Sequence, residues 1–222
     1  MRVGNGYCDS TWSPSKDNSL DAQLDDMLAV MRALKWPKAH IMGHSGAGPT
    51  IISFAVNFPQ MTEKLILVDS QMNREESART GKSVGKEPYI FESIEAAMAK
   101  HKFSNPPRFS WDRERAEKSL VKVEKGLMLK RDPDGANRQP IGEGAALPRR
   151  PVREMWEELG MVKVPMVVVR GNRSSRYPAA TVERLTKNYP HIPQVVVDSE
   201  HDVAGQARDA LVAAVKKFIA GT

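Results

Sequence analysis

The sequence predicts an α/β fold, in which a mostly parallel sheet is flanked by helices and interrupted by a helical insertion. Short apolar runs alternate with helical patterns toward both ends of the chain, as they do where strands are buried on both faces beneath helices. The middle of the chain, residues 71–155, contains no convincing strand. We therefore expect a core made of residues 1–70 and 156–222, with residues 71–155 inserted between its halves as a helical cap or lid.

The first half of the core begins with an amphipathic helix predicted at residues 18–35, for which Asn18 is a suitable N-cap. The apolar residues that recur at helical spacing and would face a core are Leu20, Leu24, Met27, Leu28, Met31 and Leu34. The elements expected next are a strand at residues 38–43 (KAHIMG), a helix at 46–58 and a buried strand at 64–69 (KLILVD).

The second half of the core repeats this order. Its expected elements are a strand at residues 164–171 (VPMVVVRG), a helix at 178–189, a strand at 192–198 (IPQVVVD) and a closing helix at 206–220. Inside the insertion we expect helices at residues 91–102 and 112–129, followed by a segment with the glycine and proline content of turns and loops.

Composition and charge exclude several classes of protein. Cys8 is the single cysteine, so no internal disulfide and no cysteine-based metal site can form, which fits a reducing compartment. The first residues lack the pattern of a signal peptide and the apolar runs are too short to span a membrane, so we expect a cytoplasmic protein without membrane contact. We also expect no cofactor and no metal.

The net charge of +6 permits an acidic partner but does not require one. Residues 71–155 carry 18 Lys and Arg against 13 Asp and Glu, so acids are mixed among the bases. No basic stripe is interleaved with aromatic residues, and no zinc or helix signature of nucleic-acid binding is present. We therefore expect no nucleic-acid partner, and an electrostatic binder that uses this insertion is the weakest reading.

The sharpest local feature is GHSGA at residues 43–47, between a predicted strand and a predicted helix. A G-x-S-x-G pattern in that place is typical of a nucleophile elbow, with Ala47 here in place of the final glycine. Ser45 is the candidate nucleophile, and the N–H of Gly46 would face a developing oxyanion. We expect His44 and Gly46 to contribute to oxyanion or substrate binding. The rival reading is a strand–turn–helix corner that needs glycines for packing alone.

The candidate base is His201, in the loop between the last predicted strand and the last helix. Loops after the carboxyl ends of parallel strands gather at one edge of a sheet, so His201 and Ser45 are expected to converge there. Asp69 ends the strand KLILVD at the same edge and is the first choice for the acid that orients the imidazole. The rival position is Ser174, in RGNRSSRY, where a hydroxyl would replace the acid.

These segments resemble the α/β-hydrolase fold superfamily of serine hydrolases and esterases. The resemblance rests on GHSGAG, KLILVD, VPMVVVRGNRS and EHDVAG, which match in order and position over residues 1–70 and 156–222. The order Ser45, Asp69, His201 fits the nucleophile–acid–histidine order of the family. Family members with the acid one strand early often carry RGxxS where others have GxxD, and RGNRS fits that pattern. The insertion at residues 71–155 corresponds to the family's variable cap.

The first residues also resemble a part of the family fold. Residues 2–9 (RVGNGYCD) resemble a loop that follows a core strand in the family, with Cys8 at the usual serine position. The resemblance implies that strands, a helix and the loop with a second oxyanion N–H precede this point in full-length relatives. We therefore expect an N-terminally truncated fold in which the strand before Ser45 is an unpaired edge, and such an edge favours a homo-oligomer.

The function that the sequence predicts is hydrolysis of a carboxylic ester, a lactone or a related acyl bond in a small molecule, through Ser45, His201 and Asp69. The expected loss of one oxyanion donor, worth a factor of about 100 to 1,000 in rate, motivates an alternative. In that alternative the chain keeps the fold but is catalytically impaired or silent, and it serves binding or assembly.

Overall fold

The computed structural model describes residues 20–70, 90–102, 113–129, 150–151 and 153–221. The expected N-cap Asn18, the segment at residues 2–9 and the turn-rich segment at residues 130–149 lie outside the described residues. The described residues divide into two compact units, one built from residues 20–70 and 150–221 and the other from residues 90–129.

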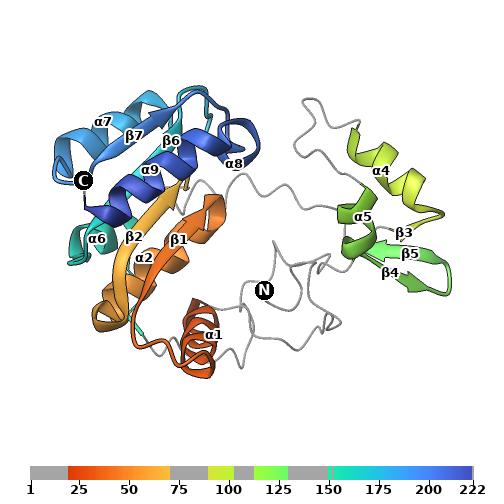
Figure 1. The fold of residues 1–222 in the computed structure, drawn as a ribbon, viewed down its shortest axis with the longest axis horizontal. Coiled ribbons are helices and arrows are strands. Elements are labelled where there is room, and N and C mark those ends of the chain that lie inside the picture. The colour runs from red at the N-terminus through yellow and green to blue at the C-terminus, as the bar shows by residue number, and fades with distance from the viewer. Residues whose placement is uncertain (1–19, 71–89, 103–112, 130–149, 152, 222) are drawn as a thin grey trace. The chain divides into compact units, whose positions relative to one another are not determined.

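The first unit contains a four-stranded sheet in which every pairing is parallel (Figure 1). In the order of the sheet, the strands are β1 (Ala39–His44), β2 (Thr62–Val68), β6 (Met166–Gly171) and β7 (Gln194–Val197). The two halves of the chain meet where β2 pairs with β6, with Leu65 opposite Met166 and Val68 opposite Val169. The predicted α/β class, with a mostly parallel sheet flanked by helices, is therefore confirmed.

Helices cover both faces of this sheet. One face packs with side chains from α1 (Leu20–Ala33), α2 (Gly48–Asn57), α6 (Met155–Met161) and α7 (Ala179–Asn188). The other face packs with α8 (Val203–Gln206) and α9 (Arg208–Ala220). Successive residues of β2 alternate between these two cores, so Leu65 and Leu67 belong to the first and Ile66 and Val68 to the second. This double burial explains the uninterrupted apolar run of that strand.

Element ends differ from the predicted ones by a few residues. Leu34 was expected in the core but is 51% exposed, because α1 ends at Ala33 and the chain turns at Lys35, whose φ is 56°. The closing helix is divided at Ala207 into α8 and α9, and the helix expected from Gly46 starts as a 3₁₀ turn, η1 (Ser45–Ala47), before α2. A second 3₁₀ turn, η2 (Pro59–Met61), precedes β2.

The second unit corrects the expectation that residues 71–155 contain no strand. A three-stranded antiparallel sheet, in the order β3-β5-β4, is formed by β3 (Ile90–Phe91), β4 (Leu120–Val123) and β5 (Gly126–Leu129). It accompanies α4 (Ile94–Lys102) and α5 (Arg113–Ser119), and Phe91, Ala97 and Leu120 form a small core.

The helix expected over residues 112–129 is wrong beyond Ser119. β-Branched Val121 and Val123 favour a strand, and the chain reverses before Gly126, whose φ of 133° only glycine adopts readily. A side chain at Gly126 would also meet the carbonyl oxygen of Phe91 at 2.5 Å.

Among the residues that the structure describes, no helix has both the length and the apolar character needed to cross a membrane.

Candidate active site

Ser45 lies directly after β1, at the point where the chain turns from strand to helix. Its φ is 55°, in the left-handed region that non-glycine residues occupy at a cost on the order of 1 kcal/mol. The turn brings the strand close to α2, because a Cβ on Gly43 would lie 2.7 Å from Ile51 Cδ1. The expected need for a glycine is therefore met at Gly43. At Gly46 the space for a Cβ is open, so packing does not require a glycine there.

The structure brings Ser45 and His201 together. His201 Nε2 lies 2.8 Å from Ser45 Oγ, and its other ring nitrogen, Nδ1, lies 2.7 Å from Asp69 Oδ2. Because a carboxylate only accepts, Nδ1–H donates to Asp69, and in a neutral imidazole Nε2 is then the acceptor for the O–H of Ser45. The arrangement is that of a hydroxyl whose proton a neighbouring imidazole is placed to take.

Asp69 follows β2 and is fully buried, with a φ of 40°. Its Oδ1 accepts the backbone N–H of Gly171 at 3.0 Å. Its Oδ2 accepts the hydroxyl of Ser174 as well as Nδ1–H of His201. These three donors satisfy both carboxylate oxygens and fix the orientation of the group. The Ser174 hydroxyl thus bonds to the acid itself, whereas the rival sequence reading had it bond to His201.

His44, the last residue of β1, is exposed and contacts His201. The two rings stack with their centroids 4.7 Å apart and their planes at 28°. His44 Nε2–H donates to the backbone carbonyl oxygen of His201 at 2.9 Å. The side chain expected to bind substrate or an oxyanion therefore has a protein partner in this structure.

Among the described residues, no histidine other than His201, and neither of the two acids beside it in the sequence, hydrogen-bonds to Ser45 or to the His201 ring. His40 is exposed on β1, and His191 is exposed with its ring against Tyr189. The side chain of His101 lies outside the described residues. Asp198 accepts from Asn172 and Arg173, and these contacts lower the pKa of its carboxyl. Asp202 accepts the backbone N–H of Gly205 in the first turn of α8, so both acids shape the loop that carries His201.

Three further residues lie near Asp69 or the turns around it, and of these Gly171 and Tyr177 belong to a segment that the sequence analysis singled out, RGNRSSRY. Ser70 donates to the carbonyl oxygen of Gly43 at 3.0 Å and so ties the residue after Asp69 to the strand before Ser45. Gly171 lies so close to the backbone of Ser199 that a Cβ added at position 171 would be 2.4 Å from the Ser199 carbonyl oxygen. Tyr177 is buried with a hydroxyl that has no hydrogen-bond partner among the described residues. Burial, together with the negative charge of Asp69, raises the pKa of Tyr177 well above its usual range.

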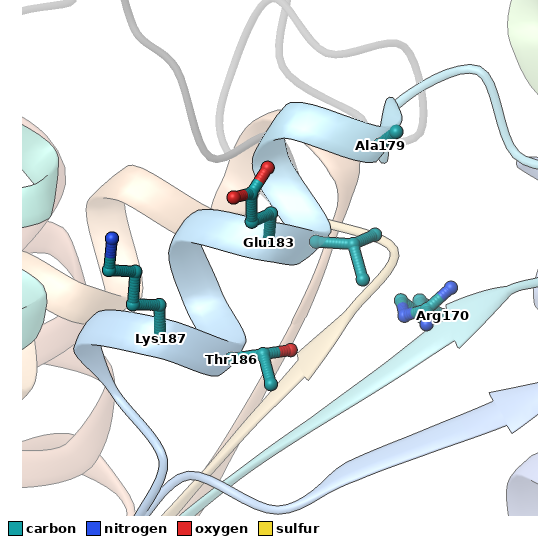
Figure 2. A pocket seen from close by; sticks show the side chains of 6 residues that line it. Arg170, Ala179, Glu183, Thr186 and Lys187 are labelled. Carbon is teal, nitrogen blue, oxygen red and sulfur yellow. The ribbon is translucent and has the colours of Figure 1, made fainter.

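A separate hollow of about 580 Å³ lies between α7 and β6 (Figure 2). Its lining residues are Arg170, Ala179, Val182, Glu183, Thr186 and Lys187. Arg170 Nε donates to Gln194 Oε1 at 3.2 Å, and none of Ser45, His201 and Asp69 lines the hollow.

Within the described ranges, no three His, Cys, Asp or Glu side chains are grouped so that they could hold a metal ion.

Comparison with known proteins agrees with this architecture. The family model described as the alpha/beta hydrolase fold matches residues 5–206. The chain belongs to the α/β-hydrolase fold family.

Relatives of this α/β-hydrolase chain include the 2-(acetamidomethylene)succinate hydrolase of Mesorhizobium japonicum, which is 25% identical over 97% of this chain and 75% of that protein. A human serine hydrolase-like protein is 35% identical over 72 residues, which are 32% of this chain and 36% of that protein. A second human protein of this kind is matched over 23% of its length, so both are covered by well under two thirds.

Solved structures show the same fold. The crystal structure of E-2-(acetamidomethylene)succinate hydrolase superimposes with a TM-score of 0.75 and 22% identity, over 94% of this chain and 76% of that one. An esterase from Mycobacterium tuberculosis has a TM-score of 0.68 and 20% identity, over 95% of this chain and 70% of that one. The relatives and neighbours named above are hydrolases or esterases, and the likeness to the solved structures shows the shared fold.

Proposed function

We propose that this chain is a serine hydrolase that cleaves a carboxylic ester, a lactone or a related acyl bond through a Ser45–His201–Asp69 triad. The observation that carries the proposal is the pair of hydrogen bonds from Ser45 Oγ to His201 Nε2, at 2.8 Å, and from His201 Nδ1 to Asp69 Oδ2, at 2.7 Å. The left-handed backbone of Ser45 supports it, since strain of this kind gathers at functional turns.

In the first half of the reaction, Ser45 Oγ attacks the carbonyl carbon while His201 Nε2 takes the hydroxyl proton. The imidazolium that forms is stabilised by the buried carboxylate of Asp69, through Nδ1–H. The Gly46 N–H donates to the oxyanion. The bond to the leaving alcohol then breaks, and the alcohol departs with the proton from Nε2. An acyl group remains on Ser45.

In the second half, His201 Nε2 takes a proton from a water molecule, whose oxygen attacks the acyl carbon. The second tetrahedral intermediate collapses, the bond between the acyl carbon and Ser45 Oγ breaks, and Nε2 returns the proton to Ser45. The net reaction consumes one ester and one water, and it releases one acid and one alcohol. The proposal assigns the choice of substrate to the insertion at residues 71–155.

The Mesorhizobium japonicum relative, which aligns with 97% of this chain, adds one argument about the class of substrate. That protein is named as a hydrolase of an acetamido-substituted succinate. Its name supports including acyl bonds other than simple esters in the proposed substrate class.

The test is labelling of the full chain by a fluorophosphonate probe, which reacts with an activated serine. We expect labelling of the native protein and of Ser175→Ala, a control that removes an exposed serine, but none of Ser45→Ala. Turnover of p-nitrophenyl acetate should follow the same pattern. Equal labelling of the native protein and Ser45→Ala would refute the assignment. A folded native chain that neither labels nor turns over would support the silent binding or assembly protein instead.

Partner and location belong to the same proposal. In the described part of the chain, β1 has a paired neighbour only on its β2 side, which supports association with a second copy along its free edge. The mass of the native protein by light scattering checks this: twice 24.7 kDa is expected, and 24.7 kDa would contradict it.

A cytoplasmic location is supported by the single cysteine, because a chain with one cysteine forms no internal disulfide and so suits a reducing compartment.

A further inference from the structure

His44 makes two contacts with His201 that the reaction above does not use. The stacked rings, 4.7 Å apart at their centroids, restrict the plane of the His201 imidazole. The hydrogen bond from His44 Nε2–H to the His201 carbonyl oxygen, 2.9 Å long, restricts its backbone. The side chain of His44 therefore restrains both the ring and the backbone of His201, the residue proposed as the base.

The loop that carries His201 has a reason to need such a contact. Ser45 follows β1 and His201 follows β7, and these strands are the two edges of the described four-stranded sheet. At the usual spacing of strands, the axes of β7 and β1 lie about 14 Å apart, and the loop and the His201 side chain together extend across β6 and β2 to reach Ser45. Each end of the short contact between Ser45 and His201 is thus supported by a different edge of the sheet.

The other backbone anchors of this loop lie toward β6 and α8. Ser199 N–H donates to Asn172 Oδ1 at 3.1 Å, and Ser199 O accepts from the N–H of Arg173 at 3.0 Å. Glu200 N–H donates to Gln206 Oε1 at 2.8 Å. The bond from His44 anchors the loop from the β1 side, one residue before the nucleophile.

We propose that His44 is a positioning residue, which ties the loop of His201 to the strand end that carries Ser45 and so holds His201 Nε2 in reach of Ser45 Oγ. This inference rests on the proposed function, because positioning has a catalytic effect only if His201 is the base. Since His44 and Ser45 are adjacent in the chain, a small movement of β1 shifts the anchor and the nucleophile together. The distance between Ser45 and His201 is then maintained.

Three substitutions separate the two contacts. His44→Phe keeps an aromatic ring and removes the donor. His44→Gln keeps an N–H donor at a similar reach from the backbone and removes the ring. His44→Ala removes both. His40→Ala is the matched control, because His40 is an exposed histidine on the same strand and its side chain makes no hydrogen bond or ring contact in the described part of the chain.

The first readout is the second-order rate of fluorophosphonate labelling at Ser45, together with kcat and KM for p-nitrophenyl acetate. We expect His44→Ala to lower the labelling rate and kcat about tenfold with little change in KM, as loss of one positioning hydrogen bond would. His44→Gln should recover most of this loss if the carbonyl bond dominates, and His44→Phe if the stacking dominates. His40→Ala should match the native protein.

The second readout does not depend on activity. The Nδ1–H of His201, bonded to Asp69, should give a downfield proton resonance that is absent from His201→Gln. In His44→Ala this resonance should broaden through faster exchange with water, whereas His40→Ala should leave it sharp. A merely structural role for His44 would lower the melting temperature without changing this signal in the folded protein.

The outcomes distinguish the two proposals. Equal labelling rates and equal resonances in the native protein and His44→Ala, with labelling lost in Ser45→Ala, would refute the role of His44 alone. Labelling that persists in Ser45→Ala would refute the proposed function, and the resonance would still report whether His44 restrains His201. A native protein without the downfield resonance would also count against the inference, because its imidazole would not be held.

Discussion

Ser174 donates a hydrogen bond to Oδ2 of Asp69, the same carboxylate oxygen that accepts Nδ1–H of His201. The two donors come from loops after β6 and β7, and the acceptor follows β2. Position 174 therefore lies only two hydrogen bonds from the imidazole. The Ser174 hydroxyl is one of the three hydrogen-bond donors to Asp69, an acid that follows a different strand.

Replacing Ser174 with alanine should weaken the site without abolishing it. The buried Asp69 carboxylate would lose one of three donors and gain rotational freedom, so we expect kcat for an activated ester to fall roughly tenfold, in line with the loss of a hydrogen bond to a charged group. KM should stay near the native value, since Ser174 is buried. The control is Ser175→Ala, and an unchanged kcat in Ser174→Ala would contradict the prediction.

Removing the acid should have a larger effect. Asp69→Asn is expected to lower kcat roughly 1,000- to 10,000-fold, because an amide neither stabilises the imidazolium nor fixes the same tautomer. Steady-state kinetics of the purified variant measure this, with circular dichroism to confirm folding. A loss of less than tenfold would mean that Asp69 does not serve the reaction.

Because Ser174 and His201 both donate to Oδ2 of Asp69, we also predict that the carboxylate can be transferred from position 69 to position 174. Asp69→Ser should be nearly inactive, and adding Ser174→Asp should restore at least part of the lost rate, because a carboxylate at position 174 would reach toward His201 Nδ1. The comparison is kcat of the double variant against that of Asp69→Ser. Equal rates in two folded proteins would contradict the prediction.

Tyr177 provides a test of stability. Its hydroxyl is buried without a hydrogen-bond partner among the described residues, so Tyr177→Phe removes an unpaired polar group and leaves the ring. We expect the free energy of unfolding to rise by about 1 kcal/mol or more, measured as a higher urea midpoint at unchanged slope. A clear decrease would indicate that the hydroxyl has a bound partner in solution.

The same residue predicts how stability depends on alkaline pH. Burial, with the charge of Asp69, raises the pKa of Tyr177. Below about pH 10, the ordinary pKa of tyrosine, both the folded and the unfolded state carry the neutral phenol. Above it the unfolded state ionises first, so stability falls as pH rises. Urea midpoints between pH 9 and about pH 11 should therefore fall less steeply in Tyr177→Phe than in the native protein.

A matched pair of glycines tests the packing beneath the loop of His201. A Cβ on Gly171 would lie 2.4 and 2.5 Å from the backbone oxygens of Ser199 and Glu200, so Gly171→Ala should displace that loop and lose most activity and stability. Gly160 in α6 has room, with the nearest atom, on Tyr189, at 3.5 Å. Gly160→Ala should raise the melting temperature, since alanine favours a helix by about 0.5–1 kcal/mol. Similar behaviour of the two variants would contradict this account.

The sequence allowed much of the fold to be predicted, because it depends on local patterns. The apolar runs of β2 and β6 follow from burial on both faces, and the meeting of Ser45, Asp69 and His201 follows from the rule that parallel strands end at one edge. The hairpin at residues 120–129 was missed, because its charged residues also suit a helix and only Gly126 marks the turn.

The contacts of Ser174 and His44 could not be predicted in the same way. Ser174 faces an acid that is 105 positions earlier in the chain, and His44 contacts a residue 157 positions later. Both partners are set by the order of strands in the sheet and by side-chain rotamers. No local period or spacing in the sequence carries that information.

The hydrogen bond between Ser45 and His201 joins residues 156 positions apart. Closing so long a loop has an entropic cost that local helix formation does not share, and contacts of this kind slow folding. Refolding after dilution from denaturant should therefore regain far-ultraviolet circular dichroism before it regains reactivity toward a phosphonate. In this chain, the reactivity of Ser45 would be one of the last native properties to return during refolding.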